Sequence, residues 1–254
     1  MKIGVVGIGT VGRPLYHVLK YYHNIVESYD KDTNEFDWYS IKEKDAVFIC
    51  VPTNMNNSQR LDMSIVDSVL KHLSILEYKG IVIIKSTLGI GYINNVIKKY
   101  SFPIIVFPEW LYEKKAFQDT VKPEMNVIGM VDKKLFRIIK KICPWYDHSK
   151  FFLVEPEEAV LIKLVANALG STKISFANQI QFICEKYDIN PTKIMDIIKC
   201  DPRCSPRYLS PGWSFSGYCL PKDTSELAYC IDNADLLQGV LKINEIIKER
   251  EKKV

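Results

Sequence analysis

The sequence is poor in the side chains that usually bind metals. It has only four histidines, and none of them lies at a spacing typical of metal ligands. Its seven cysteines are an odd number, which favours free thiols in a reducing compartment over a set of disulfides. Cys200 and Cys204 come close to a zinc spacing, but no second pair and no histidine cluster completes a ligand set. We therefore expect no metal site and a cytoplasmic location.

The sequence also lacks a strong charge of one sign and a long apolar run. Its 34 Lys and Arg against 30 Asp and Glu give a net charge of only +4, which is too small to indicate a nucleic-acid partner. No apolar run reaches the roughly 18–20 residues of a membrane span, so we expect no membrane partner. The first residues, MKIGVVGIGTVG, are apolar, but no small-residue cleavage site follows them, so we expect no signal peptide.

The remaining composition is that of a globular protein. With 254 residues, 47% hydrophobic and 25% charged, the chain has room for two medium domains or one large one. Twelve Gly and twelve Pro are ordinary numbers, which exclude the collagen-like and disordered classes.

The first part of the chain alternates short apolar runs with amphipathic stretches. Strands are predicted at Lys2–Val6, Asn24–Tyr29, Ala46–Val51, Ile81–Ile84, Ile104–Phe107 and Asn126–Met130, and helices at Val11–Tyr22, Met63–Leu76, Gly91–Lys99 and Lys133–Cys143. Near-continuous Val and Ile in the strands is typical of a parallel sheet that helices cover on both faces. We therefore predict an α/β fold, a Rossmann-like doubly wound parallel sheet, over residues 1–154.

The pattern changes after Phe151–Val154, where helical spacing replaces the alternation. A long helix is predicted at Glu157–Tyr187, with Pro156 in a position that a first helical turn tolerates. Shorter helices are predicted at Thr192–Lys199, Asp223–Ile231 and Leu236–Lys253, and an ordered loop at Ser205–Gly217. Residues 155–254 are thus predicted to form an all-helical domain.

A glycine-rich turn follows the first predicted strand. In Gly7-Ile-Gly9-Thr-Val11-Gly12 the first glycine permits a tight turn, the second lets the backbone approach a pyrophosphate, and the third lets the helix pack on the strand. Asp30 ends the second strand about twenty residues on, where it can bind a ribose 2′-hydroxyl. This acid favours NAD, because it would repel the 2′-phosphate of NADP. The alternative is a plain glycine turn with a solvated Asp.

Polar residues follow the other predicted strands at the edge where such sheets bind ligands. Thr53 and Thr87 each come after a strand, although a hydroxyl there is also common as a helix cap or turn residue. Glu109 and Glu113 are four residues apart, so they share a face if this stretch is helical. The alternative for the two carboxylates is a solvated turn.

Two further groups of residues suggest chemistry in the helical part. Lys163 and Asn167 share one face of an otherwise apolar helix, where they could donate hydrogen bonds to a developing oxyanion; a Lys there could also simply reach the solvent. Cys219 follows a loop of small residues and precedes Lys222 and Asp223. If Asp223 opens the next helix, the helix end and Lys222 both favour a thiolate. For a cysteine taken alone, a buried apolar role is the ordinary alternative.

Taken in order, these blocks closely resemble the UDP-glucose/GDP-mannose dehydrogenase family. The matching segments run from the first strand to near residue 250: GVVGIGTVG, FICVPT, KSTLGIG, PEWLYE, EAVLIKLVANALGSTKISFANQI and DPRCSPRYLSPGWSFSGYCLPKD. The resemblance implies an NAD-dependent oxidation of C6 of a nucleotide sugar, UDP-glucose or a similar one, from primary alcohol to carboxylate. It also implies a homodimer formed through the helix at 157–187.

The resemblance implies a role for each matching residue. Cys219 matches the nucleophile that forms a thiohemiacetal and then a thioester, and Glu109 the carboxylate that assists its hydrolysis. The oxyanion- and water-binding residues are matched by Lys163, Asn167 and Asp223. The cofactor contacts are matched by Gly7, Gly9, Val11, Gly12, Asp30, Thr53, Thr87, Glu113 and Lys222. The contacts to the sugar nucleotide are matched by Arg203, Tyr208, Leu209, Ser210, Pro211, Gly212 and Ser216.

The sequence departs from the family pattern in three places. Ser214 and Ser216 stand where the family usually has glycine, and Gly89 stands where it usually has proline. Family members normally continue from the last helix into a second Rossmann-like domain that completes the nucleotide site, whereas this sequence ends at Val254. The resemblance therefore leads us to expect an abbreviated, two-domain form.

Two other hypotheses fit parts of the sequence. A dehydrogenase of the β-hydroxyacid type also combines a Rossmann domain with a helical one and has a Lys-x-x-x-Asn helix, but it needs neither Cys219 nor the Lys222-Asp223 pair. A non-catalytic NAD-binding dimer would account for the absent domain. A catalytic cysteine predicts that Cys219 alkylates faster than the other six thiols, which the other two hypotheses do not predict.

Overall fold

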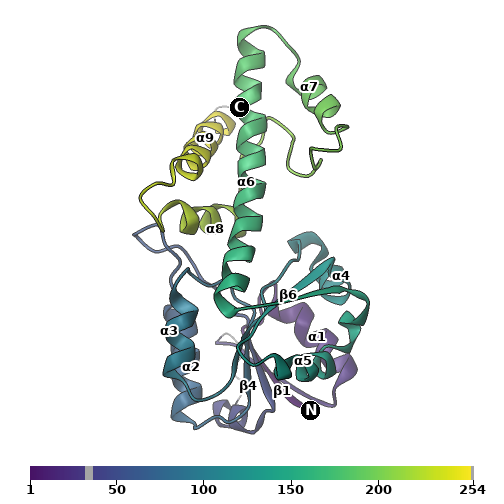
Figure 1. Ribbon diagram of the computed structural model, residues 1–254, viewed down its shortest axis with the longest axis vertical. Helices are drawn as coiled ribbons and strands as arrows, with labels where there is room; N and C mark the ends of the chain where they lie inside the picture. The colour runs from purple at the N-terminus through teal and green to yellow at the C-terminus, as the bar shows by residue number, and fades with distance from the viewer. Residues whose placement is uncertain (32–36, 253–254) are drawn as a thin grey trace. The chain divides into compact units, whose positions relative to one another are not determined.

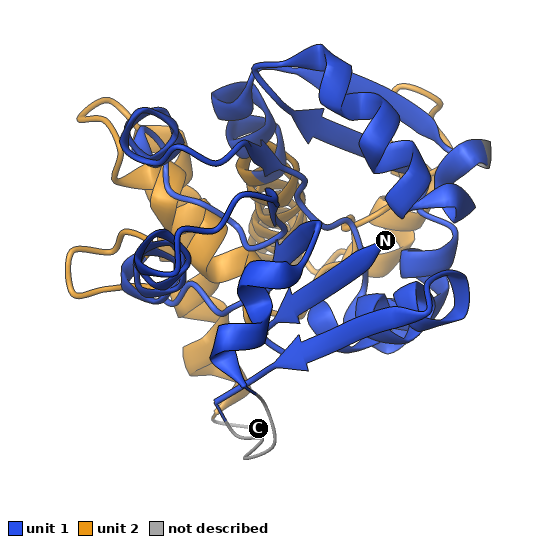
Figure 2. Cartoon of the chain, turned by 90° about the horizontal axis from the view of Figure 1, so that it is seen from below, with its two compact units in different colours: residues 1–54, 62–163 blue, residues 55–61, 164–254 orange. Residues whose placement is uncertain are grey.

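The computed structural model describes residues 1–31 and 37–252. The chain divides into two compact units, which Figure 2 shows in two colours. The first unit comprises Met1–Asn54 and Asp62–Lys163, and the second comprises Met55–Leu61 and Leu164–Val254. The short segment Met55–Leu61 thus belongs with the helical residues rather than with the sheet residues on either side of it. The assignment of residues 1–154 to a cofactor-binding domain and of residues 155–254 to a helical domain stays a prediction.

The first unit is built on a seven-stranded sheet with the strand order β2-β1-β3-β4-β5-β6-β7. The strands are β1 Lys2–Val6, β2 Ile25–Tyr29, β3 Ala46–Ile49, β4 Ile81–Ile84, β5 Ile104–Val106, β6 Met125–Gly129 and β7 Lys150–Val154. The Rossmann-like fold that the sequence predicts is confirmed, with two corrections: β7 was not among the six predicted strands, and one pair of strands is not parallel. All neighbouring strands are parallel except β5 and β6, which pair antiparallel, so the sheet is mixed. Apolar content shows that a strand is buried but not which way it runs, so the sequence did not reveal this reversal.

Helices cover both faces of this sheet, as Figure 1 shows. On one face, Ile3, Val5 and Phe48 pack into a core with α1 (Gly12–Tyr22) and α5 (Phe136–Ile142). The alternate residues Val47, Ile49 and others are equally buried on the opposite side, where α2 (Ser64–Ile75) and α3 (Tyr92–Lys99) lie. Because β1, β3, β4 and β5 are buried on both faces, these inner strands carry no polar side, which explains their continuous Val and Ile runs.

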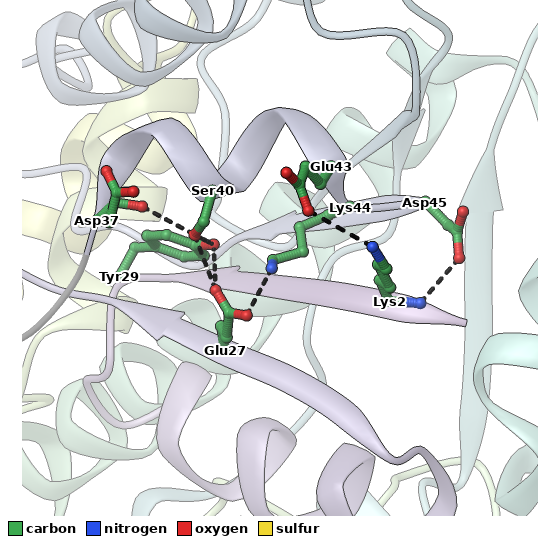
Figure 3. A network of polar contacts seen from close by, with 8 residues as sticks. All are labelled: Lys2, Glu27, Tyr29, Asp37, Ser40, Glu43, Lys44 and Asp45. Carbon is green, nitrogen blue, oxygen red and sulfur yellow. Dashed lines mark hydrogen bonds and ion pairs between the residues drawn. The ribbon is translucent and has the colours of Figure 1, made fainter.

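A polar network fixes the edge strand β2, which leads into Asp30 (Figure 3). Glu27 accepts hydrogen bonds from Tyr29 and Ser40, each 2.9 Å long, and its carboxylate lies 2.7 Å from the ammonium of the buried Lys44. Burial raises the pKa of Glu27, but Lys44 and the two hydroxyls outweigh it, so the pKa lies below its ordinary value. The network therefore holds an ionised Glu27 and ties β2 to the short 3₁₀ helix at Trp38–Glu43.

The long helix α6 covers Pro156–Lys186, within a residue of the sequence prediction at each end. Pro156 is its first residue, where the missing N–H costs no helical hydrogen bond. Asp188 then adopts a left-handed conformation with φ 53°, and Asn190 caps α7 (Pro191–Ile198) by accepting the N–H of Lys193.

The helix α6 also bears on the expectation that no run could span a membrane. By length and composition it could do so, since an 18-residue window has a mean hydropathy of 1.3, contrary to that expectation. The window is 39% buried within the protein, and core helices pass the same test, so this property is only weak evidence for a membrane span.

Two helices complete the second unit: α8 (Cys219–Ala228) and α9 (Asp235–Glu251). The helix α8 begins at Cys219, four residues before the start at Asp223 that the sequence suggested. Arg60 binds the buried Glu226 of α8 through two hydrogen bonds of 2.7 and 2.9 Å, and the backbone N–H of Leu61 donates to the same carboxylate. These bonds explain why Met55–Leu61 belongs to the second unit.

Short elements were missed in the sequence because one or two turns carry too few residues to show a period. They are the 3₁₀ helices Trp38–Glu43, Glu113–Lys115 and Pro144–His148, and the helix α4 at Ala116–Val121. The helix predicted at Lys133–Cys143 is present as a 3₁₀ turn, Lys133–Leu135, followed by α5.

Candidate functional site

The glycine-rich turn has the geometry of a phosphate-binding loop. Gly7 has φ 89°, and a Cβ on it would lie 2.7 Å from the carbonyl oxygen of Cys50. A Cβ on Gly12 would lie 1.8 Å from the carbonyl oxygen of Gly7, so both positions require glycine. Nothing lies within 4 Å of the Cβ position of Gly9. Its backbone therefore faces open space at the start of α1, beside Val11 at the N-cap, and an anion such as the NAD pyrophosphate fits there.

Asp30 lies beside this turn. Its Oδ2 accepts the backbone N–H of Ile8 at a distance of 2.5 Å. The hydrogen bond joins the end of β2 to the glycine turn, so the acid lies where the adenosine ribose of a dinucleotide would meet it. The residue that the sequence singled out by its spacing is thus placed next to Gly7 and Gly9 by a direct contact.

A cavity of about 560 Å³ opens next to the turn within the first unit. It adds two residues that the sequence analysis missed, Arg13 and His17, which are exposed and one helical turn apart on α1. Their spacing of four residues was the available signal, but exposed polar side chains on a helix are usually just solvated. Other lining residues include Gly9, Thr10, Glu113 and Phe117.

The acids after β5 are arranged differently from the sequence hypothesis. The segment with Glu109 is not helical, and Glu113 opens a 3₁₀ helix, so the two carboxylates do not share a helix face. Glu109 is buried and lies 3.0 Å from the ammonium of Lys85 at the end of β4. That ammonium also lies 4.1 Å from the ring centre of Phe107. The structure therefore forms a buried ion pair between two strand ends, which includes a Lys85 that the sequence analysis did not single out.

Three other predicted residues belong to the first unit: Thr53 and Thr87, which follow strands, and Lys163, which lies on α6. Thr53 is buried after β3, and Thr87 is half-buried after β4. Lys163 lies on α6 with its ammonium 5.0 Å from the ring centre of Trp110, which places it over the segment that follows Glu109.

Three predicted residues meet within the second unit. Asn167 of α6 donates its side-chain N–H to Asp223 Oδ2 at 2.5 Å, and the ammonium of Lys222 lies 2.7 Å from Asp223 Oδ1. Asp223 is completely buried and Lys222 nearly so. A fully buried carboxylate is stable only when it is paired and hydrogen-bonded, and here both oxygens have partners. The arrangement orients the amide of Asn167 and the ammonium of Lys222 through one shared acid.

Cys219 differs from the buried thiols of the chain. It is exposed in the first turn of α8, where backbone N–H groups without helical partners favour a negative charge. By contrast, burial raises the pKa of the Cys50 and Cys143 thiols to about 12, which makes both unreactive. Cys200 is exposed as well, but it donates a hydrogen bond to the carbonyl oxygen of Asp196.

The predicted substrate residues lie in the loop between α7 and α8. Leu209 is buried, and Tyr208, at φ 68°, packs against Gly170, where a Cβ would lie 3.2 Å from its ring. Gly212 has φ 96°, and its N–H donates to Asn178. The members with exposed or partly exposed side chains are Arg203, Ser210, Pro211 and Ser216. Arg203 is paired with Asp201, whose pKa it lowers.

The structure thus brings the predicted residues together in separate clusters within each unit. Among residues 1–31 and 37–252, no three His, Cys, Asp or Glu side chains gather into a group that could hold a metal ion. The roles assigned to the clustered residues stay predictions.

The chain matches two family models. Residues 35–147 match the NAD binding domain of the UDP-glucose/GDP-mannose dehydrogenase family, and residues 157–246 match the central domain of the same family. The cofactor of that domain is NAD, in agreement with the glycine turn and Asp30.

Individual relatives agree with this match. The chain is 32% identical over 222 residues to the UDP-glucose 6-dehydrogenase TuaD of Bacillus subtilis, which covers 81% of this chain and 47% of the relative. It is 29% identical over 219 residues to a GDP-mannose 6-dehydrogenase of Pseudomonas aeruginosa, and the match covers 80% of this chain and 50% of that relative. The chain therefore spans about half the length of these relatives.

The solved structures show the same fold. A UDP-glucose dehydrogenase from Pyrobaculum islandicum superposes with a TM-score of 0.89 at 21% identity, covering 96% of this chain and 68% of that one. Two models of one family that together account for most of the chain, and relatives that carry its name, establish the assignment. The chain belongs to the UDP-glucose/GDP-mannose dehydrogenase family.

Proposed function

We propose that this protein is an NAD-dependent nucleotide-sugar 6-dehydrogenase that uses Cys219 as a covalent nucleophile. The observation that carries the proposal is the cluster in which the half-buried Asn167 and the buried Lys222 both bind the buried Asp223, with Cys219 exposed one turn away on the same helix α8. A β-hydroxyacid dehydrogenase needs no such cysteine, and the non-catalytic alternative does not require an exposed thiol beside this cluster.

The proposed reaction removes four electrons from C6 of the sugar. NAD supplies the hydride acceptor, and two molecules are used in turn. The first hydride leaves the primary alcohol as its proton departs, which gives an aldehyde. The Cys219 thiolate adds to the aldehyde carbon to form a thiohemiacetal, and loss of the second hydride gives a thioester. Water then cleaves the C–S bond and returns the thiol. Overall, the alcohol, two NAD⁺ and one water give a carboxylate, two NADH and three protons.

The clustered residues fit the polar steps of this scheme. Each tetrahedral species carries an oxyanion, which Lys163 and Asn167 stabilise as hydrogen-bond donors. Asp223 orients Asn167 through the 2.5 Å hydrogen bond and binds the catalytic water. Glu109 assists the attack of water on the thioester, and the Lys85 ammonium at 3.0 Å fixes its orientation. The loop with Arg203 and residues 208–216 binds the nucleotide sugar.

We also propose a homodimer through α6. Apolar side chains recur along one side of this helix at spacings of four and seven residues, and each is about half exposed: Leu161 (44%), Val165 (48%), Leu169 (56%), Phe176 (53%) and Ile183 (51%). A second copy of the helix would bury this stripe. The proposed location is the cytoplasm, where the thiols stay reduced.

The proposed function is tested by NADH formation. The purified chain is incubated with NAD and, in separate reactions, UDP-glucose, UDP-N-acetylmannosamine and GDP-mannose. We expect two NADH per sugar with one of them, because no aldehyde is released. One NADH per sugar would contradict the covalent scheme. Retained NAD binding without turnover on any of the three would favour the non-catalytic alternative.

Asp30 provides an independent test of the cofactor site. We expect Asp30→Ser to weaken NAD binding by roughly tenfold, because the hydrogen bond to the ribose and the tie to Ile8 are lost. Binding of NADP should improve, because the repulsion of its 2′-phosphate is relieved. Dissociation constants from protein fluorescence quenching measure both effects. Asp132→Ser, which changes an acid that caps a 3₁₀ helix elsewhere, is the control. Equal losses for both cofactors would show that Asp30 does not select between them.

A further inference from the structure

The loop that precedes Cys219 is held by side chains from two helices of the second unit. Asn178 of α6 accepts the N–H of Gly212 at 2.8 Å and donates to the carbonyl oxygen of Trp213 at 2.9 Å. Asn244 of α9 accepts the N–H of Phe215 at 2.7 Å and donates to its carbonyl oxygen at 3.0 Å. Both amides are buried, and each satisfies both a backbone donor and a backbone acceptor of the loop.

A third attachment lies between these two and is exposed. Glu251, at the end of α9, accepts the N–H of Ser214 at 2.8 Å through Oε1 and the hydroxyl of Ser214 at 2.6 Å through Oε2. These two hydrogen bonds lower the pKa of Glu251, the hydroxyl contributing most. We call the pair Ser214 and Glu251 the loop latch.

The loop latch explains one of the departures from the family pattern. Ser214 stands where the family usually has glycine, and its hydroxyl is directed at α9. The side chain therefore adds an attachment that a glycine at the same position could not make. The attachment restricts the motion of this part of the loop. Gly217, three residues later, has φ 80° and no neighbour within 4 Å of its Cβ position, so packing does not hold it in place.

We propose that the loop latch holds residues 211–217 in the conformation that presents Cys219, which makes Ser214 and Glu251 positioning residues for this thiol. The reason is the short connection: Phe215 is pinned by Asn244, and only Ser216, Gly217 and Tyr218 separate it from the first turn of α8. A displacement of Ser214 pulls directly on its neighbour Phe215, so it weakens the two hydrogen bonds to Asn244 and then moves that turn. The thiol then loses its fixed place beside the backbone N–H groups that favour its reactive, charged form. This proposal depends on the proposed role of Cys219.

The test compares Glu251→Ala with Glu249→Ala in the full chain. Glu249 is an exposed acid on the same helix, and among the described residues it makes no hydrogen bond or ion pair to the loop, so it is a matched control. Hydrogen exchange measures the protection of the loop amides, and alkylation by iodoacetamide, followed thiol by thiol with mass spectrometry, measures the reactivity of Cys219. For Glu251→Ala we expect about tenfold faster exchange at Ser214 and about three- to tenfold slower alkylation of Cys219, with Cys200 unchanged. Glu249→Ala should change neither.

The conservative variants sharpen the result. Glu251→Gln keeps an oxygen that can accept a bond from Ser214, so it should restore part of both effects, whereas Ser214→Gly should resemble Glu251→Ala. Faster exchange with unchanged alkylation of Cys219 would reduce the loop latch to a structural contact and overturn the proposal, as would equal effects of the two alanine variants. Neither measurement requires turnover. A slower alkylation in a chain that forms no NADH would therefore contradict the proposed function and leave the loop latch standing.

Discussion

Cys219→Ser is expected to lower the rates at which the second NADH and the carboxylate product form by roughly a thousandfold or more. A serine hydroxyl stays protonated at neutral pH, so it is a far weaker nucleophile than a thiolate. Without a covalent adduct the aldehyde has no thiohemiacetal from which to lose its second hydride. The substitution changes one exposed atom, so the fold and NAD binding should be retained.

The measurement is NADH per sugar together with product analysis by mass spectrometry. Cys200→Ser is the control, because Cys200 is also an exposed thiol of the second unit but opens no helix. In the unmodified chain, Cys219 should be alkylated first, while Cys50 and Cys143 react slowest because burial raises their pKa to about 12. Unchanged stoichiometry in Cys219→Ser would eliminate the covalent scheme, whatever the rate of alkylation.

Much of the fold could be predicted because its signals are local. Each of these signals lies within one continuous segment of sequence: the glycine turn, the Val and Ile strands, and the helical periodicity of α6. The antiparallel pairing of β5 with β6 could not be predicted, since strand direction depends on how the chain travels between them through Glu113–Lys115 and Ala116–Val121. Those two elements are too short to show a helical period.

The candidate site divides in the same way. Asp30 could be located from its spacing to Gly7, because a βαβ unit has nearly constant dimensions. The position of Lys85 could not, since its partner Glu109 is 24 residues away and the contact exists only because β4 and β5 are neighbours. The loop latch spans a still longer separation, between Ser214 and Glu251. Contacts between side chains of distant segments depend on the packed structure and leave no periodic trace in the sequence.

The buried pair of Lys85 and Glu109 leads to the second large prediction, which concerns stability. Lys85→Met should lower the free energy of unfolding of the first unit by about 3–5 kcal/mol, because it leaves a carboxylate buried without its partner. The side chains are only 2% and 9% exposed, so water cannot replace the lost ammonium. Urea unfolding followed by tryptophan fluorescence measures the change, with Lys133→Met as the control. The ion pair of Lys133 with Glu155 is 47% and 60% exposed, and its loss should cost less than about 1 kcal/mol.

The double variant separates the charge from the packing. Lys85→Met with Glu109→Gln removes the unpaired charge together with its partner, so it should be more stable than Lys85→Met alone. A double variant no more stable than the single one would show that the cost lies in lost packing of the Lys85 stem against Phe107 rather than in the carboxylate. The distinction matters for the reaction, since a Glu109 held only by packing would not be oriented by charge. In that case the proposed cleavage of the thioester needs another group to direct the water, and Asp223, which the proposed scheme already assigns to the water, is the candidate.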